Sequence, residues 1–122
     1  MTISKGELAI KTILEQNKIP FKQEATFSTC FFPDTKQLAR FDFYVDNKFL
    51  IEFDGSQHFS SMQYNNCGWN TEENFQKTLN HDKIKNKWCK DNNIPLIRIP
   101  YTHYKNITIE DLKPETSKFI IA

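Results

Sequence analysis

The stretch from Arg40 to Phe59 constrains the fold most, because it combines a strand-forming apolar pattern with several ionisable side chains. Two apolar segments flank the triplet Asp46-Asn47-Lys48, and this arrangement predicts a β-hairpin. The ionisable residues on the hairpin or just after it are Asp42, Glu52, Asp54 and His58. Buried charge is costly unless it is paired or bound to a metal. The stretch therefore predicts a hairpin whose polar residues share a function.

The rest of the chain predicts a single α/β domain spanning residues 1–122, with a small mixed sheet flanked by helices. Ser4 and Glu7 have the spacing of a capping box, so we expect a helix from about Lys5 to Asn17. The other expected elements are strands at Phe21 to Phe27, Leu38 to Val45, Phe49 to Phe53 and Pro95 to Ile99, loops at Cys30 to Lys36 and Ser60 to Asn70, a long helix from about Thr71 to Asp91, and one or two short helical turns in the tail from Tyr104 to Ala122. The element order is α-β-β-β-α-β.

Composition gives no global signal for a nucleic-acid or membrane partner, because the formal net charge is only +1. Any binding surface must come from local clustering of charge. We expect no signal peptide and no membrane span, since no apolar run is long enough. The three cysteines, Cys30, Cys67 and Cys89, are scattered and odd in number, which favours a reduced, cytoplasmic protein.

The acidic residues of the hairpin predict a divalent-cation site. Asp42 and Glu52 lie at similar distances from the turn, and cross-strand neighbours are about 5 Å apart, so their carboxylates can share an ion. Oxygen ligands of this kind suit Mg²⁺ or Mn²⁺. Glu52 and Asp54 point to one face, and three acids without a nearby cation would repel one another. In the alternative interpretation Asp42 forms an ion pair with Arg40. The dipeptide Asp54-Gly55 is then only a turn that ends the strand.

Other residues supplement this site in the hypothesis. His58 follows the strand end, where it could act as a general base or contact phosphate, although a lone histidine is more often a packing residue. On the long helix, Asp82 and Lys85 share one stripe and are expected to face the hairpin. The alternative for these two is a surface ion pair.

DNA contacts are predicted outside the hairpin. Lys83, Lys87 and Lys90 form a basic stripe on the long helix, which would suit phosphate binding, although such stripes are usually solvated faces. Trp69 is a candidate wedge between bases in the polar loop, and its alternative role is to pack that loop.

Asp42, followed by Glu52-Phe53-Asp54 within the α-β-β-β-α-β order, resembles the PD-(D/E)xK nuclease superfamily. Phe41 stands where the motif has proline, and Asp54 stands where it has lysine. We hypothesise that Lys85 replaces that lysine. The resemblance extends over nearly the whole chain, from about Ser4 to Tyr101.

The sequence is more similar to the very-short-patch repair nucleases and the EDxHD homing endonucleases within that superfamily. Their pattern implies site residues at Glu7, Asp42, His58 and Asp82. The run IEFDGSQHF is also similar to the catalytic strand of small bacterial and phage proteins of this group. Glu7 then has two compatible roles, as the capping residue and as a residue at the edge of the site.

These observations together predict a metal-dependent DNA endonuclease that hydrolyses phosphodiester bonds. Asp42, Glu52 and the Phe53 carbonyl would hold Mg²⁺, His58 or Asp54 would accept the proton of water, and Lys85 would stabilise charge at phosphorus. The alternative is a catalytically inactive nuclease fold that acts as a DNA-binding or interaction module. RNA as substrate and the oligomeric state, including a homodimer, stay open.

Overall fold

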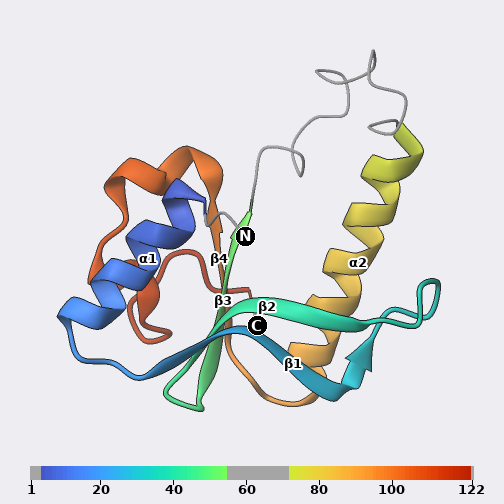
Figure 1. The fold of residues 1–122 in the computed structure, drawn as a ribbon, viewed down its shortest axis with the longest axis horizontal. Helices are drawn as coiled ribbons and strands as arrows, with labels where there is room; N and C mark the ends of the chain where they lie inside the picture. The colour runs from blue at the N-terminus through green and yellow to red at the C-terminus, as the bar shows by residue number, and fades with distance from the viewer. Residues whose placement is uncertain (1–3, 55–71, 122) are drawn as a thin grey trace.

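The computed structural model describes residues 4–54 and 72–121 (Figure 1). Its elements are α1 (Lys5–Gln16), β1 (Phe21–Phe31), β2 (Leu38–Val45), β3 (Phe49–Asp54), α2 (Glu72–Asp91) and β4 (Leu96–Pro100), followed by the 3-10 helices η3 (Tyr101–Asn106) and η4 (Ile109–Leu112). The order and the four-stranded mixed sheet confirm the predicted fold class. None of the described helices has the length and apolarity needed to cross a membrane.

The strands lie in the order β1-β2-β3-β4, antiparallel from β1 to β3 and parallel between β3 and β4. A parallel pair needs a crossover connection, and α2 lies in that connection. Helices α1 and α2 lie on opposite sides of the sheet (Figure 1). Glu52 is in register with Arg98, and Asp54 is in register with Pro100. The charged residues of β3 and β4 therefore gather at the carboxyl ends of the parallel pair.

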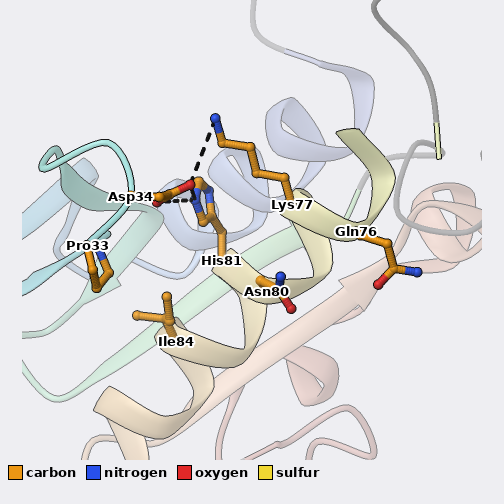
Figure 2. Close-up of a pocket in the computed structure, with 7 residues that line it drawn as sticks. All are labelled: Pro33, Asp34, Gln76, Lys77, Asn80, His81 and Ile84. Carbon is orange, nitrogen blue, oxygen red and sulfur yellow. Dashed lines mark hydrogen bonds and ion pairs between the residues drawn. The ribbon is translucent and has the colours of Figure 1, made fainter. Parts of the chain in front are cut away.

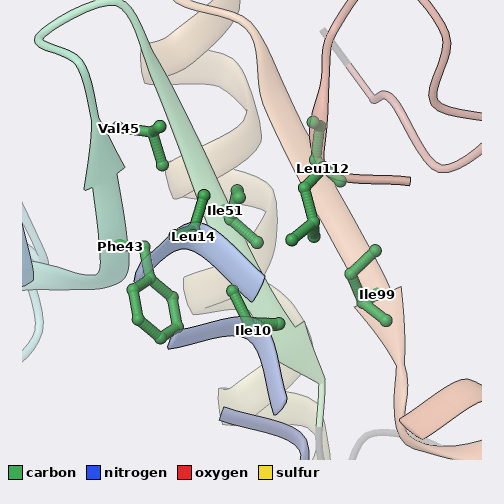
Figure 3. Packing of buried hydrophobic residues seen from close by; sticks show 8 residues of the cluster. Ile10, Leu14, Phe43, Val45, Ile51, Ile99 and Leu112 are labelled. Atoms are coloured by element: carbon green, nitrogen blue, oxygen red, sulfur yellow. The ribbon is translucent and has the colours of Figure 1, made fainter. Parts of the chain in front are cut away.

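Helix α1 begins as the capping pattern predicts and packs through its apolar stripe. The Glu7 amide donates to Ser4 Oγ at 3.2 Å. Ile10 and Leu14, one turn apart, are fully buried against the sheet. They belong to the α1-side core shown in Figure 3, which consists of Ile10, Leu14, Phe43, Val45, Ile51, Ile97, Ile99 and Leu112. Burial of this apolar surface stabilises the helix on the sheet.

The α2-side core is smaller and more mixed. It consists of Cys30, Ala39, Phe41, Leu50, Cys89 and Leu96. Trp88 packs at its edge, and its indole Nε1 donates to Thr29 Oγ1 at 3.0 Å. In α2, Cys89 is the one buried residue among the side chains described from 76 to 91. Apolar packing therefore contributes less to holding α2 than to holding α1.

Strand β1 is longer than the sequence pattern predicts. The prediction of a loop at Cys30 to Lys36 is wrong for its first two residues, because β1 continues to Phe31. Phe31 pairs with Leu38 of β2, and Cys30 is buried in the α2-side core, so cross-strand pairing and burial extend the strand. The other strands and α2 lie within one residue of their expected bounds.

The C-terminal tail forms the two expected short turns and then returns to the sheet. The Arg98 amide donates to the Phe119 carbonyl at 3.1 Å, and the Ile121 amide donates to the Leu96 carbonyl at 2.7 Å. Ile120 also forms a bridge with Ile97. The tail thereby pairs with β4 on the side away from β3, which satisfies backbone groups at that edge.

Candidate active site

Asp42 lies where strands β2 and β3 stop pairing regularly. The antiparallel register pairs Phe43 with Ile51, and continuing it by one residue sets Asp42 opposite Glu52. Instead of a ladder bond, the Phe53 amide donates to Asp42 Oδ2 at 2.7 Å. The carboxylate of Asp42 is thus held beside the Glu52–Phe53 peptide, which confirms the predicted proximity of Asp42 and Glu52.

The backbone around Asp42 is irregular on both sides. Phe41 belongs to the α2-side core and Phe43 to the α1-side core, although residues two apart on a regular strand share a face. The facing residue on β1, Glu24, has a left-handed φ of 52° between the paired residues Gln23 and Ala25. Asp42 therefore stands at the point where β2 changes the face that it presents to each core.

Glu52 is buried and forms an ion pair with α2. Lys85 Nζ donates to Glu52 Oε1 at 2.9 Å, with 13% of the lysine side chain and 9% of the glutamate side chain exposed. The same ammonium lies 5.1 Å from the centre of the Phe41 ring. This geometry confirms the expectation that Lys85 faces the hairpin.

Three carboxyl groups at the candidate site have raised pKa values. Burial, then the Glu52 charge, raises the pKa of Asp42 to about 7, against the opposing hydrogen bond from Phe53. Burial also raises the pKa of Glu52, against the attraction of Lys85. The pKa of Glu7 is raised by burial, then by Glu52 and by Glu24. A nearby cation would favour the ionised form of each group.

The position of Glu7 beside these groups depends on a close approach of α1 to β3. A Cβ atom built on Gly6 would overlap the ring of Phe53. Glycine at this position lets the first turn of α1 lie directly on the end of β3, one residue from Glu52. The cap at Ser4 and the electrostatic coupling to Glu52 coexist, so both predicted roles of Glu7 are compatible with its position.

Arg98 of β4 organises a second group of charges next to the first. Its Nη1 donates to Asp54 Oδ1 at 2.9 Å, and its Nη2 lies 3.6 Å from Asp82 Oδ1. Its Nε donates to Asn86 Oδ1 at 2.8 Å. Arg98 thus neutralises Asp54, as Lys85 neutralises Glu52, and the acids of β3 have cationic side chains as neighbours.

Arg98 is the site residue that sequence reasoning missed. It lies in the apolar run PLIRI, and only 8% of it is exposed. A charged residue inside a buried strand was the available signal, because a buried arginine requires carboxylate or amide partners. Asp54 was predicted as a metal ligand; its Oδ1 accepts from this guanidinium, and its role as a ligand stays a prediction. Asp82 lies near the same guanidinium, which connects it to Asp54 of β3.

The predicted DNA-binding lysines of α2 lie away from the candidate active site. Lys83, Lys87 and Lys90 are exposed, and Lys87 Nζ lies 2.7 Å from Asp91 Oδ2 on the same helix. Successive residues of a helix are about 100° apart, so this stripe is centred on nearly the opposite side of α2 from Lys85. Trp69 and His58 lie outside the described residues, and their roles stay predictions.

The donor set around Asp42 fits a hard cation with few protein ligands. Within residues 4–54 and 72–121, no group of three or more histidine, cysteine, aspartate or glutamate side chains is arranged to hold a metal ion. Mg²⁺ typically takes only one or two carboxylates together with water and substrate phosphate. Asp42 and Glu52, with the Phe53 carbonyl, supply such a set. Burial is the main cause of the raised pKa values of Asp42 and Glu52, and a divalent cation would favour the ionised form of both carboxyl groups.

A separate concavity of about 620 Å³ lies between α2 and the loop after β1 (Figure 2). His81 Nε2 donates to both carboxylate oxygens of Asp34, at 2.9 and 3.0 Å, and this bond lowers the pKa of Asp34. The His81 ring stacks on Phe32 at 3.8 Å, and Lys77 Nζ lies 3.9 Å from Asp34. These contacts fasten the loop to α2, about one helical turn from Lys85.

Comparison with known proteins adds one short similarity. Among curated proteins, the uncharacterized protein 307L of invertebrate iridescent virus 6 is 33% identical over 55 residues, which is 45% of this chain and 26% of the viral protein. The match thus spans about a quarter of that relative's length. No family model matches the chain, and no solved structure matches it.

Proposed function

We propose that the protein is a metal-dependent DNA endonuclease whose active site is formed by Asp42, Glu52 and Lys85. The observation that carries the proposal is the juxtaposition of two carboxylates on adjacent strands with Lys85, whose ammonium lies 2.9 Å from one of them. Phosphodiester hydrolysis needs a cation beside the scissile phosphate, to stabilise its negative charge, and a positioned water. This set of groups can provide both. The resemblance to PD-(D/E)xK nucleases points to the same chemistry.

In this proposal Mg²⁺, or Mn²⁺, is held by Asp42, Glu52 and the Phe53 carbonyl. When bound, the ion supplies Lewis-acid stabilisation of negative charge on the phosphate. Asp42 is oriented for this task by the Phe53 amide, which holds one of its carboxylate oxygens at 2.7 Å. Asp54, the third predicted ligand, accepts from Arg98 through Oδ1, as Glu52 accepts from Lys85 through Oε1.

Lys85 and Glu7 have distinct roles in the proposal. Lys85 reduces the charge on Glu52 in the free protein, and its ammonium stabilises the added negative charge when the oxygen of water bonds to phosphorus. The ester bond to the leaving oxygen then breaks, and that oxygen takes up a proton. Glu7 has a raised pKa and is a candidate to accept the proton of water, as is His58.

A plasmid-nicking assay tests the proposal directly. Supercoiled DNA is incubated with the protein in Mg²⁺, in Mn²⁺ and in EDTA, and the same assay with RNA tests the alternative substrate. Asp42→Asn removes a proposed ligand while keeping the size of the side chain. We expect cleavage to fall by at least about a hundredfold, because several kcal/mol of transition-state stabilisation is lost.

The matched control is Asp91→Asn, an isosteric change at an exposed residue at the end of α2. It should cleave like the unmodified protein. Cleavage that survives EDTA, or equal cleavage by Asp42→Asn and Asp91→Asn, would refute the assignment. Absence of cleavage in the unmodified protein together with retained DNA binding would support the inactive-fold alternative.

A further inference from the structure

A groove of about 420 Å³ lies between α1 and the segment that follows β4. Ile13 and Ile107 line it and also pack against the α1-side core, so the groove has an apolar floor. Leu8 lines it from α1 and is 50% exposed, which is unusual for a large apolar side chain on a helix with a well-buried stripe. Tyr104 lines it from η3.

The charges along this groove are of one sign. Lys5 of α1 and Lys105 of η3 both line it, and both are exposed. The Lys105 ammonium lies 5.6 Å from the centre of the Tyr104 ring. None of the described residues that line the groove is acidic. By contrast, the concavity in Figure 2 contains Asp34, whose charge compensates Lys77.

The groove begins at the same end of the sheet as the candidate active site. Lys5 lies in the first turn of α1, two residues before Glu7. Helix η3 starts directly after Pro100, which is in register with Asp54. Lys5 and Glu7 are about 200° apart around α1, so the groove and the carboxylates at the end of β3 lie on different sides of this helix.

We propose that this groove binds a strand of DNA, with backbone phosphates at Lys5 and Lys105 and with Leu8 and Tyr104 against sugar and base. The inference rests on the proposed function for the identity of the polyanion. Charge complementarity favours this occupant, because two exposed cations flank apolar and aromatic surface, the combination that single strands of nucleic acid contact. The groove replaces the lysine stripe of α2 as the predicted DNA-binding surface.

The experiment measures binding of a short fluorescein-labelled DNA duplex, and of one of its strands, by fluorescence anisotropy in EDTA over a range of NaCl concentrations. Each lysine–phosphate contact contributes about 0.9 to the slope of log K against log salt on duplex DNA. The double variant Lys5→Ala/Lys105→Ala should bind at least about tenfold more weakly, with a slope smaller by about 2. Leu8→Ser should weaken binding while the slope stays the same, because it removes apolar contact only.

Two control pairs remove the same charge elsewhere. Lys22→Ala/Lys48→Ala changes exposed lysines near the β2–β3 turn, at the other end of the sheet, and should retain the slope. Lys87→Ala/Lys90→Ala tests the α2 stripe. Circular dichroism checks that every variant is folded.

The proposal is overturned if the Lys5/Lys105 variant binds with the slope of the Lys22/Lys48 pair, if the α2 pair alone loses affinity, or if the unmodified protein binds no DNA. Because binding is read in EDTA, it is independent of cleavage. A protein that binds through the groove but nicks no plasmid supports the groove and removes the nuclease proposal. If the unmodified protein nicks plasmid but the groove variants bind DNA as well as it does, the nuclease proposal is supported and the groove proposal is refuted.

Discussion

Helices α1 and α2 cover opposite faces of one sheet but are attached to it by different interactions (Figure 1). Helix α1 is held by the fully buried side chains of Ile10 and Leu14. Among its side chains from residue 76 on, helix α2 is held by polar contacts, including Lys85 with Glu52 and Asn86 with Arg98, and by the packing of Trp88 and Cys89. Apolar packing tolerates small shifts, whereas a buried ion pair requires one geometry. The helix with less apolar anchoring is thus the one that places charged groups at the candidate site.

The largest expected effect comes from Arg98→Met, which breaks the polar attachment of α2. It leaves the carboxylates of Asp54 and Asp82 without their guanidinium, and removing one partner of a buried ion pair costs about 4 kcal/mol. We expect the free energy of unfolding in urea to fall by about that amount. Lys87→Ala, which breaks an exposed pair on the same helix, should change it by less than about 0.5 kcal/mol. Equal effects of the two changes would show that Arg98 does not anchor α2.

Gly6→Ala tests how closely α1 is attached to β3. The new methyl group would overlap the Phe53 ring, and overpacking of this kind costs about 2 kcal/mol. In addition, the shift of α1 away from β3 should move Glu7 from Glu52 and lower the pKa of Glu7. Chemical denaturation measures the first effect, and carboxyl NMR titration measures the second. Ala9→Gly, in the same helix, is the control for altered helix propensity. A stable Gly6→Ala protein with an unchanged Glu7 titration would contradict the close-approach argument.

A pH dependence originates between the two helices, at Asp42. Its pKa is raised to about 7 in the folded protein from an ordinary value of 3.8. The folded state therefore holds a proton that the unfolded state has lost between pH 4 and pH 7. The contribution of Asp42 to stability is present below about pH 4 and is lost as pH rises toward 7, by about 1 kcal/mol per pH unit.

Asp42→Asn should flatten this dependence in urea unfolding measured from pH 5 to pH 8. Addition of Mg²⁺ should lower the pKa of Asp42 in the unmodified protein, because the cation favours the carboxylate. A carboxyl titration of Asp42 near its ordinary value, or one unaffected by Mg²⁺, would argue against its role as a ligand.

Much of this molecule follows from local pattern. The Ser4 cap with its apolar stripe predicts α1, and alternation around Asp46-Asn47-Lys48 predicts the hairpin. The expected proximity of Asp42 and Glu52 holds because a hairpin turn sets its own register. The local pattern did not predict the full length of β1, because its last residues are held by cross-strand pairing and burial.

Other charge contacts depend on the tertiary structure, because no local pattern predicts them. Arg98 and Asp54 are 44 residues apart in the chain, and the groove joins the first turn of α1 to η3. A parallel strand pair brings such residues together only through its crossover, which no local pattern encodes. The sequence by itself therefore determined the elements and the acidic pair on the hairpin. The fold decided that Arg98 neutralises Asp54, because burial of charge is stable only where distant partners converge.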